Sequence, residues 1–317
     1  MKISFKSHVV YFFAPSFKES SAGIKTLYQI VDLFNNEGLD SHILLQNETI
    51  GSLRSTLKYH FNAPLLTLDA LEKHREEQRI PVLVYPDTVY TNPFHAENVC
   101  RIILYFDGAL SGHSSLYNSK KEGIIFFSRS IMHESNIKNA LYHQILSLPL
   151  LDINYPIRNN KKNRKEIYYY DGKFTSNFDG MIPDDIKQYT SISRDKKNSL
   201  NRNEIFSLLK DAKLIHIFED TALIYESLLL GCPVNIHPNG KFYKCKPLGE
   251  NEVKLYGSMT KRYVSEKDIE KAMNEIDLFR DEYERWKTKG IDDVKKVLEK
   301  IKIHKYSFSN NLYKKLK

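Results

Sequence analysis

The stretch LIHIFEDTALIYESLLLGCPVNIHPNG, residues 214–240, decides the fold of this chain. It opens with LIHIF, an apolar run of strand length, and an acidic, hydroxyl-bearing turn follows. The apolar spacing then predicts a helix over 222–230, which Gly231 ends, and a second strand that starts at Pro233. A strand, a turn, a helix and a second strand in this order are the building block of a parallel sheet.

Such a turn lies at the carboxyl edge of a sheet. There the free N–H groups and the dipole of the helix favour a phosphate. Glu226, one turn into the helix, would then reach a ribose. The alternative is that any α/β protein contains such units and that Glu226 is merely solvated. Spacing alone leaves both interpretations open.

Residues 219–234, EDTALIYESLLLGCPV, resemble the donor-binding signature of GT-B glycosyltransferases. The resemblance is to the large retaining group, the family 4-like enzymes, that builds bacterial surface polysaccharides such as lipopolysaccharide and capsule. It implies that Glu226 binds the nucleotide ribose and that Glu219 faces the donor sugar. The two glutamates enclose one residue fewer than is usual in the family. The diphosphate would be held by the residues that open the helix: Asp220, Thr221, Ala222 and Leu223.

Length and composition set the protein class. A chain of 317 residues suits two domains of about 150 residues each. Hydrophobic content of 41% supplies packed cores and excludes a disordered protein. The three cysteines, Cys100, Cys232 and Cys245, show no CxxC spacing, which favours a reducing cytoplasm. No signal peptide is visible, and no apolar run approaches the about eighteen residues of a membrane span.

The formal net charge of +8 has its main excess of lysine near the end of the chain, in residues 287–317. One interpretation is a solvated basic face. The other is a peripheral contact with anionic lipid headgroups at the inner face of the plasma membrane, which would bring the protein to a lipid-linked acceptor. Nucleic-acid binding is not expected, since the basic run near residue 160 lacks interleaved aromatic residues.

The first half alternates strands with helices. Residues 24–38 predict an amphipathic helix that Gly38 ends. Six runs predict strands: 8–15, 41–46, 81–86, 101–108, 123–128 and 148–153. Together they predict a doubly wound α/β domain over residues 1–157, which the resemblance makes the acceptor domain.

The polar, basic residues 154–166 are the expected linker. A second domain, 158–290, restarts the alternation with a strand at 167–172 and a helix at 201–213 that Asn201 and Glu204 cap. The end of the chain predicts two helices split at Gly290. The resemblance implies a GT-B fold, with two Rossmann-like domains facing a central cleft and the basic segment 291–317 packing back on the first domain.

Three further residues are candidates for the nucleotide-sugar site. Lys173 directly follows a strand, where a fixed cation can neutralise the departing diphosphate without a metal. Gly172 would allow close approach of the backbone. Arg194 would be a second contact to the phosphates or the base. The alternative for Lys173 is one exposed lysine among many.

The acceptor candidates lie in the first half. Gly23 belongs to a small-residue loop before the first helix. YPDTVYTNPFH, residues 85–95, resembles a stretch found in some surface-polysaccharide transferases, which places Asp87, Asn92 and His95 near the acceptor. A capped loop that starts at Asn-Pro is the other interpretation. His113 would bind a sugar hydroxyl. Asp87 is the first candidate for a general base if the reaction inverts.

The sequence lacks HExxH, paired cysteines and the Asp-x-Asp of GT-A enzymes, so no metal and no cofactor are expected. Together with the resemblance, it predicts a metal-independent glycosyltransferase that moves a hexosyl-type sugar from a nucleotide-sugar to a lipid-linked glycan. Two alternatives stay open. One is an epimerase-like sugar-nucleotide enzyme on the same fold, and the other is a non-catalytic partner in polysaccharide assembly.

Overall fold

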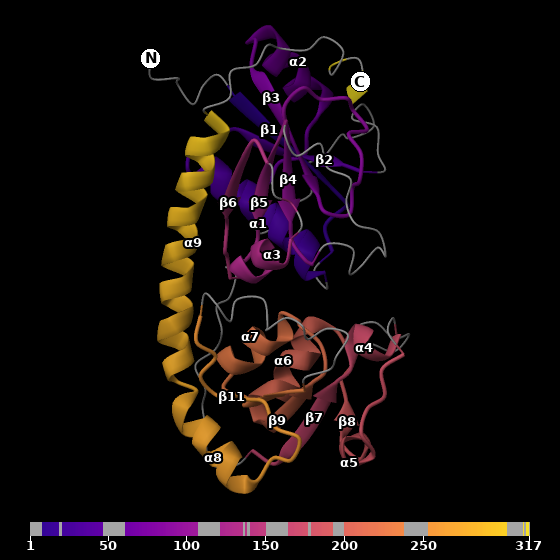
Figure 1. Cartoon of the computed structure of the whole chain (residues 1–317), viewed down its shortest axis with the longest axis vertical. Helices are drawn as coiled ribbons and strands as arrows, with labels where there is room; N and C mark the ends of the chain where they lie inside the picture. The colour runs from indigo at the N-terminus through magenta and orange to yellow at the C-terminus, as the bar shows by residue number, and fades with distance from the viewer. Residues whose placement is uncertain are drawn as a thin grey trace. The chain divides into compact units, whose positions relative to one another are not determined.

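The structure is a computed structural model that describes residues 8–18, 21–46, 61–106, 121–135, 137, 140–149, 164–176, 179–192, 200–237, 253–302, 313 and 315–316. The chain divides into two compact units (Figure 1). Unit 1 contains residues 1–152 and 287–317, and unit 2 contains residues 153–286. The domain boundaries expected from the sequence, after residues 157 and 290, stay predictions.

Unit 1 is built on a parallel sheet of six strands in the order β2-β1-β3-β4-β5-β6. The strands are β1 (His8–Ala14), β2 (Ser41–Leu45), β3 (Ile80–Pro86), β4 (Val99–Ile103), β5 (Glu122–Phe126) and β6 (Tyr142–Ile145). The first five fall on the predicted apolar runs, since a strand covered on both faces needs apolar side chains at nearly every position.

Helices cover both faces of this sheet, as Figure 1 shows for α1 and α2. One face packs against α1 (Ala22–Asn36) and the second part of α9 (Leu278–Lys302). The other face packs against α2 (Leu68–Glu76), Tyr313 and Leu316. A short α3 (Arg129–Glu134) follows β5. Gly38 follows the end of α1 at a φ of 84°, which confirms it as the predicted stop of this helix.

The sixth strand was predicted at 148–153, of which residues 150–153 lie outside the described part of the chain. The strand is β6, and the described residues Leu148 and Pro149 lie outside any strand. Sequence reasoning chose the more apolar run. However, β6 pairs with β5 alone and exposes His143, so it does not need apolar residues throughout. Leu148 is buried because it packs in the core that contains Val294 and Val297.

Unit 2 is built on a parallel sheet of five strands in the order β11-β10-β9-β7-β8. The strands are β7 (Glu166–Tyr170), β8 (Thr190–Ser191), β9 (Ala212–Ile217), β10 (Val234–Ile236) and β11 (Ser258–Met259). The helices are α4 (Gly172–Ser176), α5 (Asp184–Lys187), α6 (Arg202–Asp211), α7 (Leu223–Leu229), α8 (Glu266–Glu275) and the first part of α9. Two parallel sheets joined by helices confirm the predicted α/β class with two doubly wound sheets.

The deciding stretch folds as the strand, helix and strand that its pattern predicts. β9 leads through the turn into α7, and β10 lies next to β9 in the sheet. Gly231 has a φ of 76°, its N–H binds the carbonyl of Leu228, and the N–H of Cys232 binds the carbonyl of Ser227. This pair of bonds is a Schellman ending, which confirms Gly231 as the stop. The capping box of Asn201 and Glu204 is also present at the start of α6.

The predicted break at Gly290 is wrong, because Gly290 lies inside α9. The two terminal helices meet instead near residue 277, between α8 and α9. A Cβ atom at Gly290 would lie 2.8 Å from the carbonyl oxygen of Ser147. The glycine is therefore needed for close packing of unit 1 against the helix and does not end it.

The basic run that the sequence assigns to a linker includes one buried residue, Arg164. Its guanidinium donates to the carbonyls of Leu209, Ala212 and Leu230 at 2.9–3.1 Å. These carbonyls lie at the ends of α6 and α7, so Arg164 satisfies groups that the helices leave unpaired. Burial lowers the pKa of Arg164. Residues 154–163 lie outside the described part of the chain.

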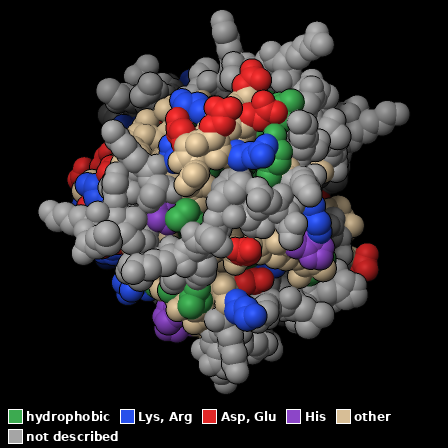
Figure 2. All heavy atoms as spheres, turned by 90° about the horizontal axis from the view of Figure 1, so that it is seen from above, with side chains coloured by type: hydrophobic (Ala, Val, Ile, Leu, Met, Phe, Trp, Pro, Cys, Tyr) green, Lys and Arg blue, Asp and Glu red, His purple; other side chains and the backbone are tan. Residues whose placement is uncertain are grey.

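Acidic and basic side chains lie next to one another on the face shown in Figure 2. None of the described helices has the length and apolarity needed to cross a bilayer.

Candidate functional site

The strand order of unit 2 reverses between β7 and β9, since β8 lies on one side of β7 and β9 on the other. Ligands of open parallel sheets bind beside the carboxyl ends of the strands at such a switch point. Gly172 lies two residues after the end of β7, and Glu219 lies two residues after the end of β9. The structure thus brings together two predicted site residues that are 47 positions apart in the sequence.

Two independent constraints require glycine at position 172. Its φ of 46° lies in the left-handed region, which favours glycine. A Cβ atom at this position would also overlap the carboxylate of Glu219, whose residue is only 4% exposed. The carboxylate of Glu219 thus occupies the space beside Gly172, and close approach of this backbone to a diphosphate stays a prediction. The backbone of Lys173 is placed next to Gly172, as the second residue of α4.

A second buried carboxylate, that of Asp171, lies at the same edge. Asp171 is 3% exposed, and the hydroxyl of Thr175 donates to its Oδ2 atom at 2.9 Å. Sequence reasoning did not select it. The signal was present, because Asp171 is the acidic residue that ends the apolar strand YYY. Two buried acidic residues at one sheet edge make a nearby cation favourable.

The turn before α7 contains the residues predicted to bind the diphosphate. The N–H of Leu223 donates to the hydroxyl of Thr221 at 3.4 Å, so this amide is used within the turn. The N–H of Glu226 donates to the carbonyl of Ala222 at 3.1 Å. In the described part of the chain, no acceptor pairs with the amides of Thr221 and Ala222. Asp220 is half-buried in the same turn.

Glu226 is 3% exposed, and its Oε1 atom lies 3.5 Å from Nε of Arg202. Arg202 is the first residue of α6, and its guanidinium also lies 4.8 Å above the ring of Phe206. Sequence reasoning missed Arg202, although it directly follows the predicted cap Asn201. The predicted ribose ligand is thus held in a partly buried ion pair beside the switch point.

Unit 1 has its own switch point, between β1 and β3. Ser21 and Gly23 follow β1, and Asp87 follows β3. The hydroxyl of Ser21 accepts from the N–H of Ile24 at 3.4 Å and so caps α1. Among the described residues, a Cβ atom at Gly23 would meet Leu104 alone, at an ordinary 3.8 Å. The carboxylate of Asp87 accepts from the N–H of Tyr105 at 3.2 Å.

Asn92 organises the loop that follows β3. Its carbonyl oxygen accepts from the hydroxyl of Tyr85 at 3.0 Å and from the N–H of Ala96 at 2.9 Å. Its amide nitrogen donates to the carbonyl of Ala96 at 2.8 Å. His95 is exposed, with a φ of 49°. These contacts fit the capped-loop interpretation, and contact of Asn92 and His95 with an acceptor stays a prediction. Arg194 and His113 lie outside the described residues.

A histidine pair lies at the carboxyl ends of β9 and β10. His216 Nδ1 and His237 Nε2 are 2.8 Å apart, and the amide nitrogen of Asn235 lies within 3.2 Å of both. Phe218 stacks on His237, with ring centroids 4.3 Å apart. Burial lowers the pKa of His216 to about 3 and that of His237 to about 4. The neighbouring His237 lowers the pKa of His216 further, whereas Asp185 partly offsets the shift of His237. Both rings are neutral at pH 7.

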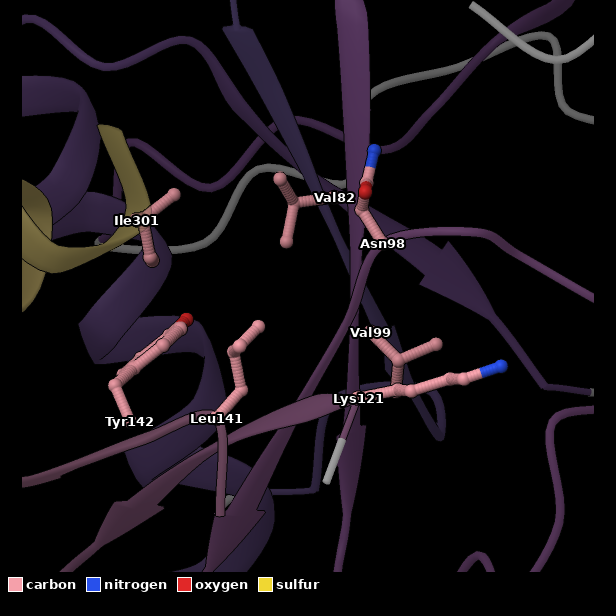
Figure 3. A pocket seen from close by; sticks show the side chains of 7 residues that line it. All are labelled: Val82, Asn98, Val99, Lys121, Leu141, Tyr142 and Ile301. Atoms are coloured by element: carbon pink, nitrogen blue, oxygen red, sulfur yellow. The ribbon is translucent and has the colours of Figure 1, made fainter. Parts of the chain in front are cut away.

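A small depression in unit 1 lies at the opposite, amino-terminal edge of its sheet. Figure 3 shows that its lining comes from strand starts and from α9, and that the ammonium group of Lys121 points away from it. Its size suits about one water molecule. The lining residues are Val82, Asn98, Val99, Lys121, Leu141, Tyr142 and Ile301. This space does not overlap the predicted acceptor residues.

Comparisons with known proteins find similarity at the level of solved structures. No family model and no curated protein matches the chain. Sucrose-phosphate synthase from Thermosynechococcus elongatus is 10% identical, with a TM-score of 0.49 over 93% of this chain and 96% of that one. WaaG, a glycosyltransferase involved in lipopolysaccharide biosynthesis, is 10% identical, with a TM-score of 0.46 over 92% and 95%.

A third solved structure is UGT71G1 of Medicago truncatula, complexed with UDP-glucose. It is 11% identical, with a TM-score of 0.44 over 94% of this chain and 99% of that one. At such identities no residue of these proteins assigns a role to a residue of this chain. The function proposed below is argued from the chain's own residues.

Proposed function

We propose that this chain is a GT-B glycosyltransferase that moves a sugar from a nucleotide-sugar donor to a glycan acceptor. The observation that carries the proposal is the switch point of unit 2. The residues that resemble a donor-binding signature lie there, and Gly172 and Glu219 meet there although nothing in their spacing requires it.

The donor binds along the carboxyl edge of β7 and β9. The diphosphate lies against the amides of Thr221 and Ala222, where the described residues supply no competing acceptor. Lys173 neutralises the negative charge that the leaving diphosphate develops, and buried acidic residues close by favour a cation there. Since fixed groups of the chain meet this charge, transfer proceeds without a metal.

Glu226 binds the ribose, and Arg202 orients it. A carboxylate accepts hydrogen bonds from the two ribose hydroxyls, and before the donor binds, Nε of Arg202 lies 3.5 Å from Oε1 of Glu226 and holds this side chain in place. Donor binding moves Arg202 from Nε contact with Glu226 toward the phosphates or the base. Arg202 is therefore a positioning residue of the proposed site.

The acceptor binds at the switch point of unit 1, near Asp87. Glu219 faces the donor sugar in a retaining reaction. If the reaction inverts, Asp87 removes the proton of the acceptor hydroxyl. The acceptor is a lipid-linked glycan of bacterial surface polysaccharide synthesis, and Lys295, Lys296 and Lys300, which are exposed on α9, contact the anionic headgroups around it.

A non-catalytic nucleotide-binding subunit is the second candidate. The observation that favours it is the burial of Glu219 and Glu226, because a donor must displace protein contacts to reach either carboxylate. Such a subunit binds a nucleotide-sugar and transfers nothing.

The test begins with thermal stabilisation by a panel of UDP-, GDP-, CDP- and TDP-sugars, because a ligand that binds only the folded chain raises its melting temperature. The best donor is then incubated with a lipid-linked glycan, with and without EDTA, and release of nucleoside diphosphate is measured. Release in both conditions supports a metal-independent transferase, whereas stabilisation without release supports the binding subunit. Isomerised donor without acceptor points to an epimerase, and a panel without any stabilisation overturns the proposal.

Glu226→Gln is the matched variant, and Glu204→Gln is its control. Both residues are glutamates on unit 2 helices, but Glu204 is exposed at the cap of α6. We expect Glu226→Gln to weaken donor binding by about tenfold or more and Glu204→Gln to leave it unchanged. Equal binding by both variants excludes Glu226 from the site.

A further inference from the structure

Three side chains of unit 1 converge on one point although the sequence separates them. Asp40 directly precedes β2, His42 lies in β2, and His74 lies in α2. His42 Nε2 is 2.8 Å from Asp40 Oδ1, and His74 Nε2 is 3.1 Å from Asp40 Oδ2. The three ligand atoms lie within 4.8 Å of one another. Both imidazoles therefore point the same ring nitrogen toward one carboxylate.

Outer contacts hold two of these side chains in place. His74 Nδ1 lies 2.9 Å from the hydroxyl of Tyr11, which fixes the orientation of this ring. Arg79 approaches Asp40 Oδ2 at 3.4 Å and is itself anchored to the carbonyl of His8 at 2.7 Å. Metal-binding histidines and carboxylates are held by partners of this kind, which orient them and tune their basicity.

The cluster combines burial with access. His42 and His74 are 8% and 3% exposed, whereas the side chain of Asp40 is 36% exposed. Hydrogen bonds from both histidines keep the pKa of the Asp40 carboxyl well below its usual range. The ligand set is thus one carboxylate and two imidazoles, open to solvent on one side.

The cluster is separate from the proposed acceptor site. Asp40 and His42 lie where β2 starts, at the amino-terminal edge of the sheet, whereas Gly23 and Asp87 follow strand ends at the carboxyl edge. Nothing in the transfer reaction uses these three residues. Their function must be sought outside the transfer chemistry.

We propose that Asp40, His42 and His74 bind a divalent transition-metal ion of the zinc type. Two imidazole nitrogens and one carboxylate oxygen suit Zn²⁺ rather than Mg²⁺ or Ca²⁺, which prefer oxygen ligands alone. The fourth position belongs to water, because the solvent side of Asp40 is open.

Metal binding needs a small local rearrangement. His74 turns its Nε2 from Asp40 Oδ2 to the ion, while the hydroxyl of Tyr11 keeps its contact with Nδ1. Asp40 binds the ion through Oδ1 and keeps Oδ2 for Arg79, so the guanidinium pairs with the ligand carboxylate and not with the ion. Both histidines bind in their neutral forms, and acid therefore releases the metal.

The bound ion cross-links α2 to the start of β2 through His74 and His42. Leu71 of α2 packs in the same core cluster as Tyr11 of β1. The same helix contacts Tyr313, whose hydroxyl lies 3.2 Å from Glu72 Oε1. The ion therefore stabilises unit 1 without taking part in transfer.

The test titrates the complete, metal-free chain, without a histidine tag, with ZnCl₂ by calorimetry and with CoCl₂ by visible absorption. We expect one equivalent to bind, a rise in the melting temperature of unit 1, and Co²⁺ bands typical of four-coordinate N/O ligands. Asp40→Asn and His42→Gln should each weaken binding by at least about tenfold. Asp40→Asn keeps the shape of the side chain but removes its charge, so circular dichroism of the metal-free variant must first show that it is folded. A folded Asp40→Asn chain that binds as the unmodified chain does overturns the proposal.

His133→Gln and His143→Gln serve as controls, because both histidines are exposed in unit 1 and lie outside the cluster. Each of these two control variants should bind one equivalent of metal ion, as the unmodified chain does. Absence of binding overturns the proposal, and so does binding that Asp40→Asn and His42→Gln leave unchanged. Loss of binding in the controls would assign the metal to exposed histidines and would overturn it as well.

Discussion

The two sheets place polar residues at the same kind of switch point, but they build the two edges differently. In unit 2, Asp171, Glu219 and Glu226 are 3–4% exposed, and Gly172 leaves no room for a side chain. In unit 1, Gly23 has space for a methyl group and Asp87 is half-buried. Under the proposed function, the rigid edge of unit 2 would hold the nucleotide, and the more open edge of unit 1 would take the acceptor.

The largest expected effect is on catalysis at the edge of unit 2. Lys173→Ala should lower kcat by about 10²–10³-fold, because it removes the cation that meets the charge of the leaving diphosphate. Lys187→Ala is the control, since Lys187 in α5 pairs with the exposed Asp184. Steady-state release of nucleoside diphosphate measures both. Equal rates for the two variants would remove Lys173 from the mechanism.

As the pH falls, the free energy of unfolding should decrease for unit 2 at a higher pH than for unit 1. The pKa values of His216 and His237 in the folded chain lie below the ordinary value of 6.5, so protonation favours the unfolded state. Their contribution to stability is full above pH 6.5 and is lost as the pH falls toward 4. Each imidazole should cost about 2 kcal/mol between pH 7 and pH 5. The depressed pKa of Asp40 acts in a lower window, because its stabilisation is lost only below pH 3.8.

Urea unfolding followed by tryptophan fluorescence measures this effect. Trp286 is the single tryptophan and packs in the core of unit 2, so it reports on that unit. Replacing both histidines by Asn should flatten the pH dependence, whereas His143→Gln, at an exposed position, should not. A free energy of unfolding that is constant from pH 7 to pH 5 would contradict the account.

A pair of glycine substitutions tests the contrast between the edges. Gly172→Ala should cost about 2–3 kcal/mol, because it adds left-handed strain and overlaps Glu219. Gly23→Ala, in the first turn of α1, should be neutral or stabilise by up to about 1 kcal/mol. Chemical unfolding measures both, with fluorescence for unit 2 and circular dichroism for unit 1. An equal loss of stability in the two variants would contradict the distinction between a rigid sheet edge in unit 2 and a tolerant one in unit 1.

The smallest effect is expected in the loop of unit 1. Asn92→Ala removes three hydrogen bonds that hold residues 92–96 and should cost about 1–2 kcal/mol. If the loop is only structural, KM for the acceptor should change little. A large rise in this KM with unchanged stability would instead place Asn92 in contact with the acceptor.

Local patterns predicted much of the fold because they depend on neighbours in the sequence. The alternation of β9, α7 and β10, the stop at Gly231 and the capping box at Asn201 each depend on a few adjacent residues. Sequence reasoning missed β6, because a strand at the edge of a sheet needs few apolar residues. The break at Gly290 was predicted wrongly, because a glycine that allows close packing cannot be told from one that ends a helix. The short α2, α3 and α5 gave too little periodicity to predict.

The candidate site was predictable only in part, for the same reason. Residues 219–226 form one continuous stretch and were found. Arg202 and Asp171 reach that edge from other elements, and Tyr11, Asp40, His42 and His74 converge from three elements with no motif spacing. Such clusters depend on strand order and register, which a single sequence does not specify.

The position of a bound diphosphate tests the central claim most directly. The chain would be crystallised with the nucleoside diphosphate that stabilises it most. The account predicts the two phosphates against the amides of Thr221 and Ala222, with the ribose hydroxyls within hydrogen-bonding distance of Glu226. Phosphates bound away from the carboxyl ends of β7 and β9, with Glu226 still paired to Arg202, would contradict it.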